Sequence, residues 1–258
     1  MLELQIFDDT GVSESLGYIL VFAIVLTGIA GIVFFGVTML NDAKDRNNFQ
    51  NVEQGLTVVQ SDMKRVAMEK APLKASKLRV EGGTLVMDFN ASSIRVDFAG
   101  HTYDNYTGDI SFDSSKDGKM LSIENGGLWK TYGEPMNELG IVPPRIFAST
   151  ANNAIVINVI RLKGNDTAFG GVGTISLNMA YVSNNVYTFA SAVPADVTIK
   201  VNTTYATAWA RFLQDTIQMF PVTTDNVTDR SVQMTISDVS EVIICEHTIC
   251  VEPIIFYG

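Results

Sequence analysis

Few side chains in this sequence have the types and spacing that chemistry requires, and one group of them lies near the C-terminal end. Cys245, His247 and Cys250 could offer thiolates and an imidazole to a metal ion, but a structural zinc site takes four such ligands. The chain has only 2 histidines, so a catalytic triad or a multi-histidine centre lacks material. The five-residue offset across a turn also suits a small-loop disulfide, so we predict a Cys245–Cys250 disulfide in preference to free thiols or a metal site.

A second stretch, residues 113–124, partly matches a calcium-binding loop. The oxygen-bearing side chains of this match are Asp113, Ser115, Asp117 and Glu124. They alternate around a turn that contains Gly118, and the last of them stands at the twelfth position, as in a calcium loop. However, Leu121 occupies a ligand position, and both flanks have the pattern of strands rather than helices. We therefore predict a plain β-hairpin turn here and no calcium ion.

Composition and the remaining motifs argue against an enzyme or a nucleic-acid binder. The glycine-rich run Phe169–Gly173 is followed by a strand pattern and not by a helix, so a dinucleotide site is not predicted. No Walker motif, nucleophile elbow or catalytic carboxylate pair stands out in the sequence. The formal net charge is −10 and basic residues are not clustered, which excludes the cationic surface that nucleic acid requires. We predict a protein without catalytic activity and without cofactors.

The longest apolar segment lies near the N-terminus. Residues 16–40 (LGYILVFAIVLTGIAGIVFFGVTML) contain no charged side chain. A helix of about 20 apolar residues spans the hydrocarbon core of a bilayer, so this segment is long enough to cross a membrane once. We predict a single membrane anchor that carries a domain outside the lipid.

The helix predicted for this segment continues into an amphipathic stretch. Apolar residues recur at alternating spacings of three and four, as in a heptad seam: Phe49, Val52, Leu56, Val59, Met63 and Val66. Pro72 cannot continue a helix, because it lacks the N–H group and clashes with the preceding turn. We expect one continuous helix over residues 16–70, whose seam packs either on the chain's own β domain or on neighbouring subunits.

From about residue 76 the apolar periodicity changes to two, which is typical of strands. Many short strands separated by Gly, Asn and Asp predict an antiparallel, sandwich-like sheet. One helix interrupts them from Thr204 onward, behind a threonine cap, and should cover one face of the sheet. Its apolar face comprises Ala206, Trp209, Leu213 and Ile217. The predicted fold class is α+β: a long N-terminal hydrophobic helix, then a mainly antiparallel β-sandwich-like head with one packed helix.

Sequons for N-glycosylation support an external position for the β domain. The five of them begin at Asn90, Asn105, Asn165, Asn202 and Asn226, all after the apolar segment. The paired cysteines point the same way, because disulfides persist in oxidising compartments. Lys44 and Arg46 follow the segment and would by themselves favour a cytoplasmic domain. We give the first two features more weight and predict an extracellular, glycosylatable domain.

The start of the apolar segment, Gly11-Val-Ser-Glu-Ser-Leu-Gly-Tyr-Ile-Leu-Val-Phe22, resembles the N-terminus of archaeal type IV pilin-like and archaellin-like surface proteins. The stretches Ile123–Trp129 (IENGGLW) and Tyr205–Trp209 (YATAW) are also similar to the head domain of that group. The resemblance is closest over residues 11–70. It implies a hydrophobic helix that is first held in the membrane and is then buried in the core of a filament.

The resemblance also implies processing of the N-terminus. In that family a prepilin peptidase removes a short leader, which here would end at Gly11 and leave Val12 as the new terminus. Glu14 would then either pair with the terminal amine of a neighbouring subunit or stabilise the start of its own helix. Family members carry Lys or Arg just before the glycine, whereas this sequence has an aspartate and a threonine there. An unprocessed chain would keep an acidic leader, which suits a membrane anchor better than a filament core.

A stripe of small residues within the apolar segment could form an assembly surface. Ala23, Thr27 and Gly31 recur at every fourth position and therefore lie on one face of the helix. Small residues let two helices approach closely in apolar surroundings, although they are also common in membrane helices that do not associate. Both interpretations stay open from the sequence.

The sequence thus predicts a leader (residues 1–11), a membrane or filament-core helix with an amphipathic stalk (residues 12–71) and a β-rich head (residues 73–258). The function implied by the resemblance is that of a structural subunit of an archaeal surface filament with an exposed, adhesive head. Its partners would be further copies of itself, the prepilin peptidase with the assembly machinery, and the membrane before assembly. The alternative is a membrane-anchored surface binding protein that presents the same head without polymerising.

Overall fold

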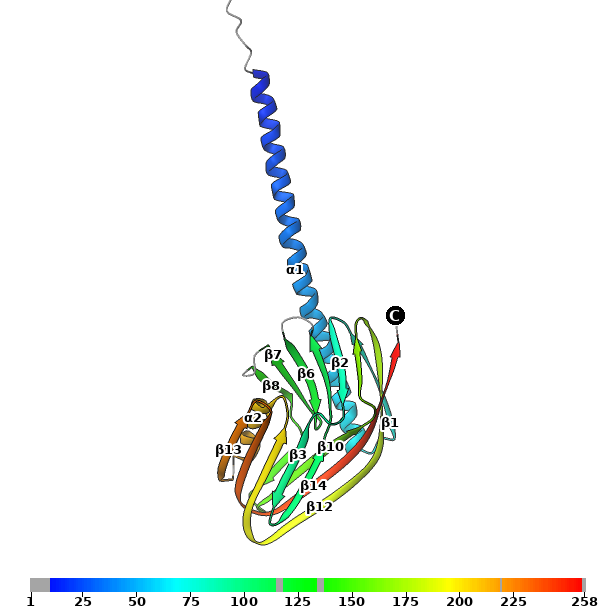
Figure 1. Cartoon of the computed structure of the whole chain (residues 1–258), viewed down its shortest axis with the longest axis vertical. Helices are drawn as coiled ribbons and strands as arrows, with labels where there is room; N and C mark the ends of the chain where they lie inside the picture. The colour runs from blue at the N-terminus through cyan, green and yellow to red at the C-terminus, as the bar shows by residue number, and fades with distance from the viewer. Residues whose placement is uncertain (1–9, 115–117, 134–136, 219, 257–258) are drawn as a thin grey trace, which may run out of the picture. The chain divides into compact units, whose positions relative to one another are not determined.

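The computed structural model describes residues 10–114, 118–133, 137–218 and 220–256, with the backbone alone at residues 10–15 and 223–225. The described chain forms two compact units, which divide between Asn47 and Asn48. The described residues of the first unit, 10–47, are helical, and the second unit contains every described strand together with the end of the long helix. Figure 1 shows the elements of both units.

Helix α1 (Thr10–Met68) is continuous over 59 residues and confirms the predicted long N-terminal helix. It ends just before Lys70, whose backbone is left-handed with φ of 55°, and before Pro72. The heptad seam from Phe49 to Val66 is buried in one hydrophobic cluster with residues of both sheets of the head. The seam therefore packs on the chain's own β domain, which was one of the two predicted alternatives.

The strands form two sheets and are antiparallel in all pairs but one, so the predicted α+β class with a β-rich head is confirmed. The eight-stranded sheet runs β4-β3-β12-β14-β10-β9, with β1 on β12 and β13 on β14, and the six-stranded sheet runs β11-β2-β5-β6-β7-β8. The parallel pair is β10 with β14. The strands are β1 (Leu73–Val80), β2 (Gly83–Asp88), β3 (Ser93–Phe98), β4 (His101–Tyr106), β5 (Asp109–Ser114), β6 (Lys119–Glu124), β7 (Gly127–Tyr132), β8 (Glu138–Val142), β9 (Ile146–Ser149), β10 (Ala154–Lys163), β11 (Thr167–Gly170), β12 (Gly173–Asn202), β13 (Val222–Thr228) and β14 (Ser231–Phe256).

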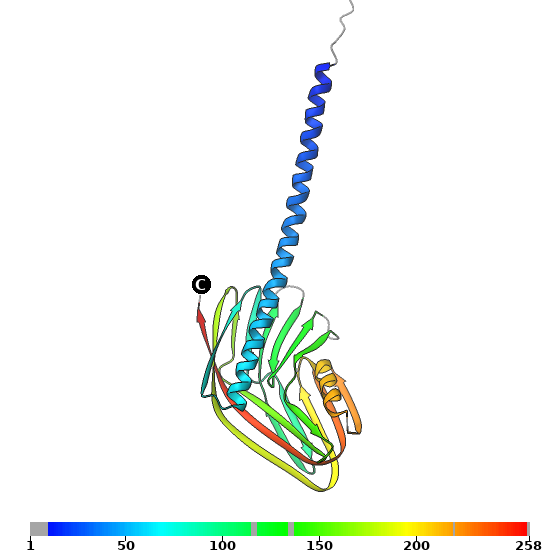
Figure 2. The ribbon, with the colours of Figure 1, turned by 180° about the vertical axis from the view of Figure 1, so that it is seen from behind.

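Two long, bent strands give the larger sheet its frame. β12 and β14 pair along almost their whole length, and both curve around the outside of the head in Figures 1 and 2. The sequence pattern predicts only short strands in this part of the chain. The ladder is instead continuous because register shifts after Tyr181 and Ala190 absorb the bend without ending either strand.

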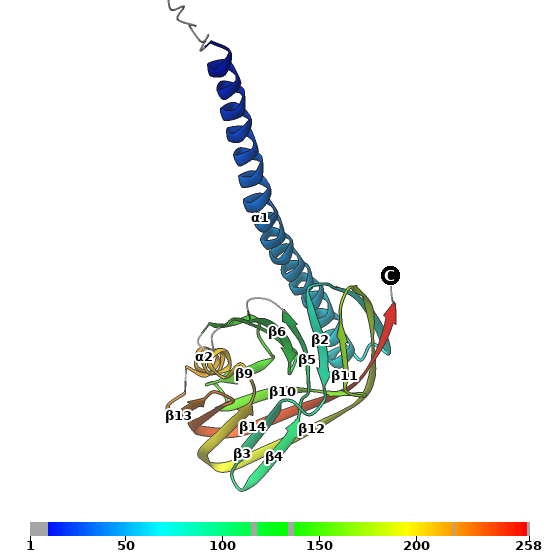
Figure 3. The same ribbon diagram turned by 45° about the horizontal axis from the view of Figure 1, so that its top comes forward.

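Helix α2 (Ala206–Ile217) is the one packed helix that the sequence predicts, and it contacts β8, β9 and β14 (Figure 3). Its apolar face is buried in a second hydrophobic cluster, together with Trp129 of β7. The predicted threonine cap is wrong, because Tyr205 stands at the N-cap and its side chain makes no capping hydrogen bond. The Oγ1 of Thr203 instead accepts the N–H of Tyr205 just before the helix.

Candidate functional site

The apolar part of α1 offers the largest surface without a partner in its own chain. One helix of the described chain is long and apolar enough, by length and composition, to cross a membrane. No residue of its most apolar stretch is buried. A signal sequence would pass the same test, so the structure by itself establishes only an apolar helix. Large side chains are exposed on every side of it, including Tyr18, Ile32 and Phe34. Such a surface requires lipid or other helices around it, because apolar area in water is unfavourable.

The small-residue stripe is an indentation on this helix. Thr27 donates its hydroxyl to the carbonyl of Ala23 at 2.7 Å, so its polar group is satisfied within the helix. A methyl group built on Gly28 or Gly31 would meet nothing within 4 Å. An open apolar groove beside the stripe is lined by Leu16, Ile19, Leu20, Ala23, Ile24 and Thr27. The stripe can therefore accept a second helix at close range without leaving a hydroxyl unpaired.

The predicted processing residues lie at the start of the same helix. The backbone of Gly11, Val12 and Glu14 is helical, within the first turns of α1. Cleavage after Gly11 and the pairing of Glu14 with a neighbouring terminus stay predictions, as does the role of the stripe in assembly.

The predicted disulfide between Cys245 and Cys250 is wrong. Both cysteines are free, and both lie on the single strand β14, where Cys245 pairs with Val186 and Cys250 with Ala180 of β12. Five residues of extended chain separate their Cα atoms by about 16 Å, whereas a disulfide requires less than about 7 Å. The turn expected between them does not exist, because residues 245–250 continue the strand β14. Glu246 and His247, which lie between the cysteines, bond to Tyr103 and Asn158 on other strands.

The calcium-loop candidates do not converge. Ser115 and Asp117 lie outside the described residues. Asp113 is exposed near the end of β5 and pairs with Met120, whereas Glu124 is buried at the far end of the β5–β6 hairpin. No group of three or more His, Cys, Asp or Glu side chains in the described parts of the chain is placed to hold a metal ion.

Glu246 of β14 is the centre of a buried polar network that joins four strands. Its side chain is 2% exposed, and Oε2 accepts hydrogen bonds from the hydroxyl of Tyr103 at 2.6 Å and from Nδ2 of Asn105 at 3.0 Å. Its Oε1 accepts from Nη1 of Arg161 at 3.4 Å and from Nδ2 of Asn185 at 3.3 Å. With four donors and one positive charge around it, this carboxylate is fully used in holding β4, β10, β12 and β14 together.

A second group of buried carboxylates lies beneath α2. Glu124 and Asp109 are direct cross-strand partners on β6 and β5, and both are buried. The Oε2 of Glu124 accepts hydrogen bonds from the hydroxyl of Thr203 and from Nε1 of Trp209 at 3.3 Å. Burial, followed by the charge of Asp109, raises the pKa of Glu124 to about 8. Burial also raises the pKa of Asp109 to about 7. Two carboxyls this close cannot both ionise at low cost, so at neutral pH the pair carries a proton.

Glu138, the first residue of β8, is the third carboxyl of this group, and its side chain contacts the start of α2. Its Oε2 accepts the N–H of Ala208 at 3.0 Å, one of the helix N–H groups without an intrahelical partner. Its backbone carbonyl accepts a hydrogen bond from Arg211 at 3.1 Å. Burial raises the pKa of Glu138 as well. Glu124 and Glu138 thus join α2 to the six-stranded sheet, and we refer to these two residues together with Asp109 as the α2 carboxyl cluster.

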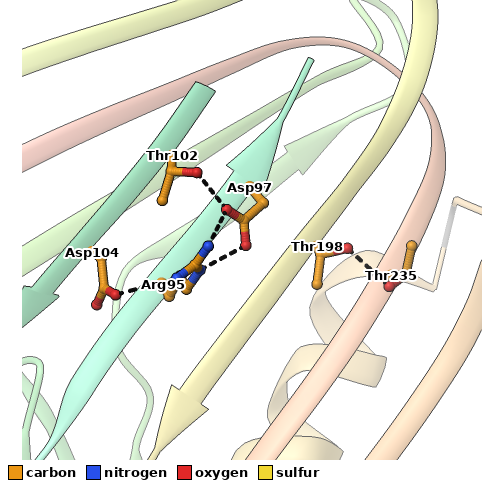
Figure 4. A network of polar contacts seen from close by, with 6 residues as sticks. All are labelled: Arg95, Asp97, Thr102, Asp104, Thr198 and Thr235. Atoms are coloured by element: carbon orange, nitrogen blue, oxygen red, sulfur yellow. Dashed lines mark hydrogen bonds and ion pairs between the residues drawn. The ribbon is translucent and has the colours of Figure 1, made fainter. Parts of the chain in front are cut away.

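The exposed face of the larger sheet carries ordinary surface pairs. Figure 4 shows Arg95 on β3 between Asp97 and Asp104, with its Nε 2.8 Å from Oδ2 of Asp97. The hydroxyl of Thr102 also donates to Asp97, at 2.6 Å. Exposed pairs of this kind contribute little to stability and form no enclosed site.

The five sequons differ in how far their side chains are free. Four asparagines are exposed, in the turn after β2, in the loop between β10 and β11, at the end of β12 and on β13: Asn90, Asn165, Asn202 and Asn226. Two of the five asparagines use their amide nitrogens in hydrogen bonds within the head. Asn105 donates to Glu246, and Asn202 donates to the hydroxyl of Ser93 at 2.8 Å. Attachment of glycans to any of them stays a prediction.

Comparison with known proteins places the chain in a family. Residues 10–252 match the model of DUF7289, which is described as a family of unknown function. The chain belongs to the DUF7289 family. It is also 36% identical over 95 residues to an uncharacterized protein of the archaeon Archaeoglobus fulgidus, a match that covers 36% of this chain and 31% of that relative. No solved structure matches this DUF7289 protein.

Proposed function

We propose that this DUF7289 protein is the structural subunit of an archaeal type IV pilus-like surface filament. In this proposal residues 16–40 of α1 are held in the membrane before assembly and form the filament core afterwards. The head is then displayed on the outside, where it contacts the environment. The resemblance of residues 11–22 to archaeal pilin-like proteins supports the proposal, as does the relative in an archaeon.

The observation that carries the proposal is the exposure of the apolar half of α1 on all sides. The seam on the second half of the same helix is buried by the head, whereas no part of the most apolar stretch of the helix is buried within the chain. A filament core of packed helices would cover this surface all round, and the stripe at Ala23, Thr27 and Gly31 would allow close approach. The hydrogen bonds that Glu124, Glu138 and Glu246 accept within the head favour this structural role over a catalytic one.

The decisive experiment is to shear the cell surface and to determine the intact mass and N-terminal sequence of the released protein. A chain that begins at Val12 and is recovered in high-molecular-weight material supports the filament subunit. Recovery only in the membrane fraction, with residues 1–11 intact, contradicts it and favours the membrane-anchored surface protein. As a matched pair of variants, Gly31→Leu should reduce the sheared material, whereas Ile32→Leu, next to it but off the stripe, should not.

A further inference from the structure

One edge of the larger sheet is long, open and uncharged. β1 pairs with residues 173–180 of β12 and β3 pairs with residues 197–202, while β14 follows the opposite edge of the strand. Between them, no described strand pairs with the outer edge of residues 183–190 (SNNVYTFA), which we call the open edge. Its main-chain N–H and C=O groups that point away from β14 therefore lack a strand partner, and such a row is a template for another strand.

The other edges of the head carry the features that prevent such pairing. The outer strand β1 contains Lys74, Lys77 and Arg79, the edge strand β4 contains Asp104, and the edge strands β9 and β11 have 4 residues each. Natural proteins protect sheet edges in these ways, with charges and with short strands. The open edge has neither protection, because no charged residue occurs from position 167 to 195.

The side chains along the open edge also favour contact. Val186 is 60% exposed, while Val182 and Val193 on either side of this segment are exposed as well. On the opposite face, Tyr187 and Phe189 are held in place by ring contacts with Tyr103 and His101 at 5.5 and 4.9 Å between centroids. The strand is therefore fixed in an extended conformation before any partner arrives, which lowers the entropy lost on pairing.

We propose that the open edge pairs with the open edge of a second copy of this chain, in an antiparallel arrangement about a twofold axis. The proposal goes beyond the filament and does not require it. A second copy fits because residues 48–258 carry 22 acidic and 16 basic side chains, a formal net charge of −6, so two heads repel each other except where their surfaces are uncharged. Antiparallel pairing of identical edges brings no like charges together here and forms a closed, isologous contact.

The register follows from the alternation of the strand. Residues that face each other across an antiparallel pair lie on the same face, so the two position numbers of a facing pair must add to an even number. The register centred on Val186 places this valine opposite its own copy. It places Asn184 opposite Thr188, two polar side chains that can share a hydrogen bond. This arrangement buries the most exposed apolar side chain of the open edge.

Cysteine cross-linking of the full-length protein in detergent tests both the contact and the register. The background is Cys245→Ser with Cys250→Ser, because Cys245 faces Val186 across the β12–β14 ladder and would trap an introduced thiol. Under copper–phenanthroline oxidation, Val186→Cys should give a covalent dimer as its main product. Thr188→Cys alone should not, because the two copies of residue 188 would be about 13 Å apart, four residues along the strand.

A mixture of Asn184→Cys and Thr188→Cys chains should cross-link to the same extent as Val186→Cys. Asn90→Cys, in an exposed turn, is the control for cross-linking by random collision. In the chain with its native cysteines, Val186→Lys should lower the dimer fraction at least tenfold in mass photometry, whereas Asn90→Lys should leave it unchanged. Unchanged tryptophan fluorescence shows that the variants fold. Cross-linking of Val186→Cys and of the mixed pair no higher than the Asn90→Cys level overturns the proposal. These tests do not use sheared filaments, so failure of the open-edge proposal can be distinguished from failure of the filament proposal.

Discussion

The α2 carboxyl cluster predicts that ionisation of Glu124 weakens the head as the pH rises. Burial raises the pKa of Glu124 from 4.5 to about 8, so the folded state binds this proton more tightly than the unfolded chain does. The resulting stabilisation is complete below pH 4.5 and is lost as the pH rises through about 8. Each pKa unit corresponds to about 1.4 kcal/mol, so the contribution lost across this window is on the order of 4 kcal/mol.

Glu124→Gln isolates this contribution. The amide oxygen of glutamine can still accept the hydrogen bonds of Thr203 and Trp209, while the side chain no longer ionises. We expect the variant to match the parent protein within about 1 kcal/mol at pH 5 and to exceed it by a few kcal/mol at pH 8.5. Comparing variant and parent at each pH cancels the titrations of groups that do not interact with Glu124. One is that of His247, whose pKa is lowered by burial and which therefore removes stability as the pH falls below 6.5.

Urea unfolding followed by tryptophan fluorescence is the assay, with the full-length protein in detergent. The chain has 2 tryptophans, Trp129 and Trp209, whose rings lie 4.8 Å apart in the core beside the α2 carboxyl cluster, so the signal reports on the docking of α2. Glu252→Gln, at an exposed position of β14, is the matched control and should follow the parent at every pH. If the difference between Glu124→Gln and the parent stays constant from pH 5 to 8.5, the reasoning is refuted.

Three further predictions concern the head. Glu246→Ala removes the acceptor of four donors and leaves the partly buried guanidinium of Arg161 without its carboxylate, so it should cost about 3 kcal/mol in urea unfolding, while Glu252→Ala stays within about 0.5 kcal/mol. Leu56→Ala, fully buried on the seam, should cost about 2–5 kcal/mol, whereas Val58→Ala, 57% exposed, should cost far less; equal losses would mean that the seam is not packed on the head. In glycopeptide mass spectrometry, the sequons at Asn90, Asn165 and Asn226 should be occupied ahead of those at Asn105 and Asn202, whose amides donate within the head; the reverse order would contradict this reasoning.

The helices of the fold can be predicted from the sequence, because each depends on the spacing of apolar residues within its own segment. The continuous helix and its buried seam are predicted by apolar spacing alone, and Pro72 marks where the helix must stop. The buried face of α2 follows from the same spacing, with Trp209 and Leu213 at the expected positions. The position and the buried face of each helix can therefore be predicted without knowledge of its tertiary contacts.

The polar core could not be predicted, because its partners are far apart in the chain. Tyr103 and Glu246 are separated by 143 positions, and no local pattern connects them. The disulfide prediction is wrong for the same reason. The five-residue spacing of the cysteines suggests a turn, whereas Glu246 and His247 between them are buried on a continuous strand and have partners on other strands. One local pattern could have indicated a buried acidic residue. Glu124 directly follows the apolar strand residue Ile123 and precedes a tight turn.

The two longest stretches without a charged residue are 15–41 and 167–195. Folding of the chain on itself explains the parts of these stretches that are buried, but it leaves the apolar half of α1 and the open edge of β12 exposed. A protein with a net charge of −10 has charged residues to spare for such surfaces, so their absence at these two places favours contacts outside the chain. The buried glutamates Glu246, Glu124 and Glu138, which could have served chemistry, are meanwhile hydrogen-bonded within the head. This division, with buried acidic groups inside and uncharged surfaces outside, supports the proposal of a protein that works by assembly. A lysine introduced into either stretch should therefore reduce association before it reduces stability.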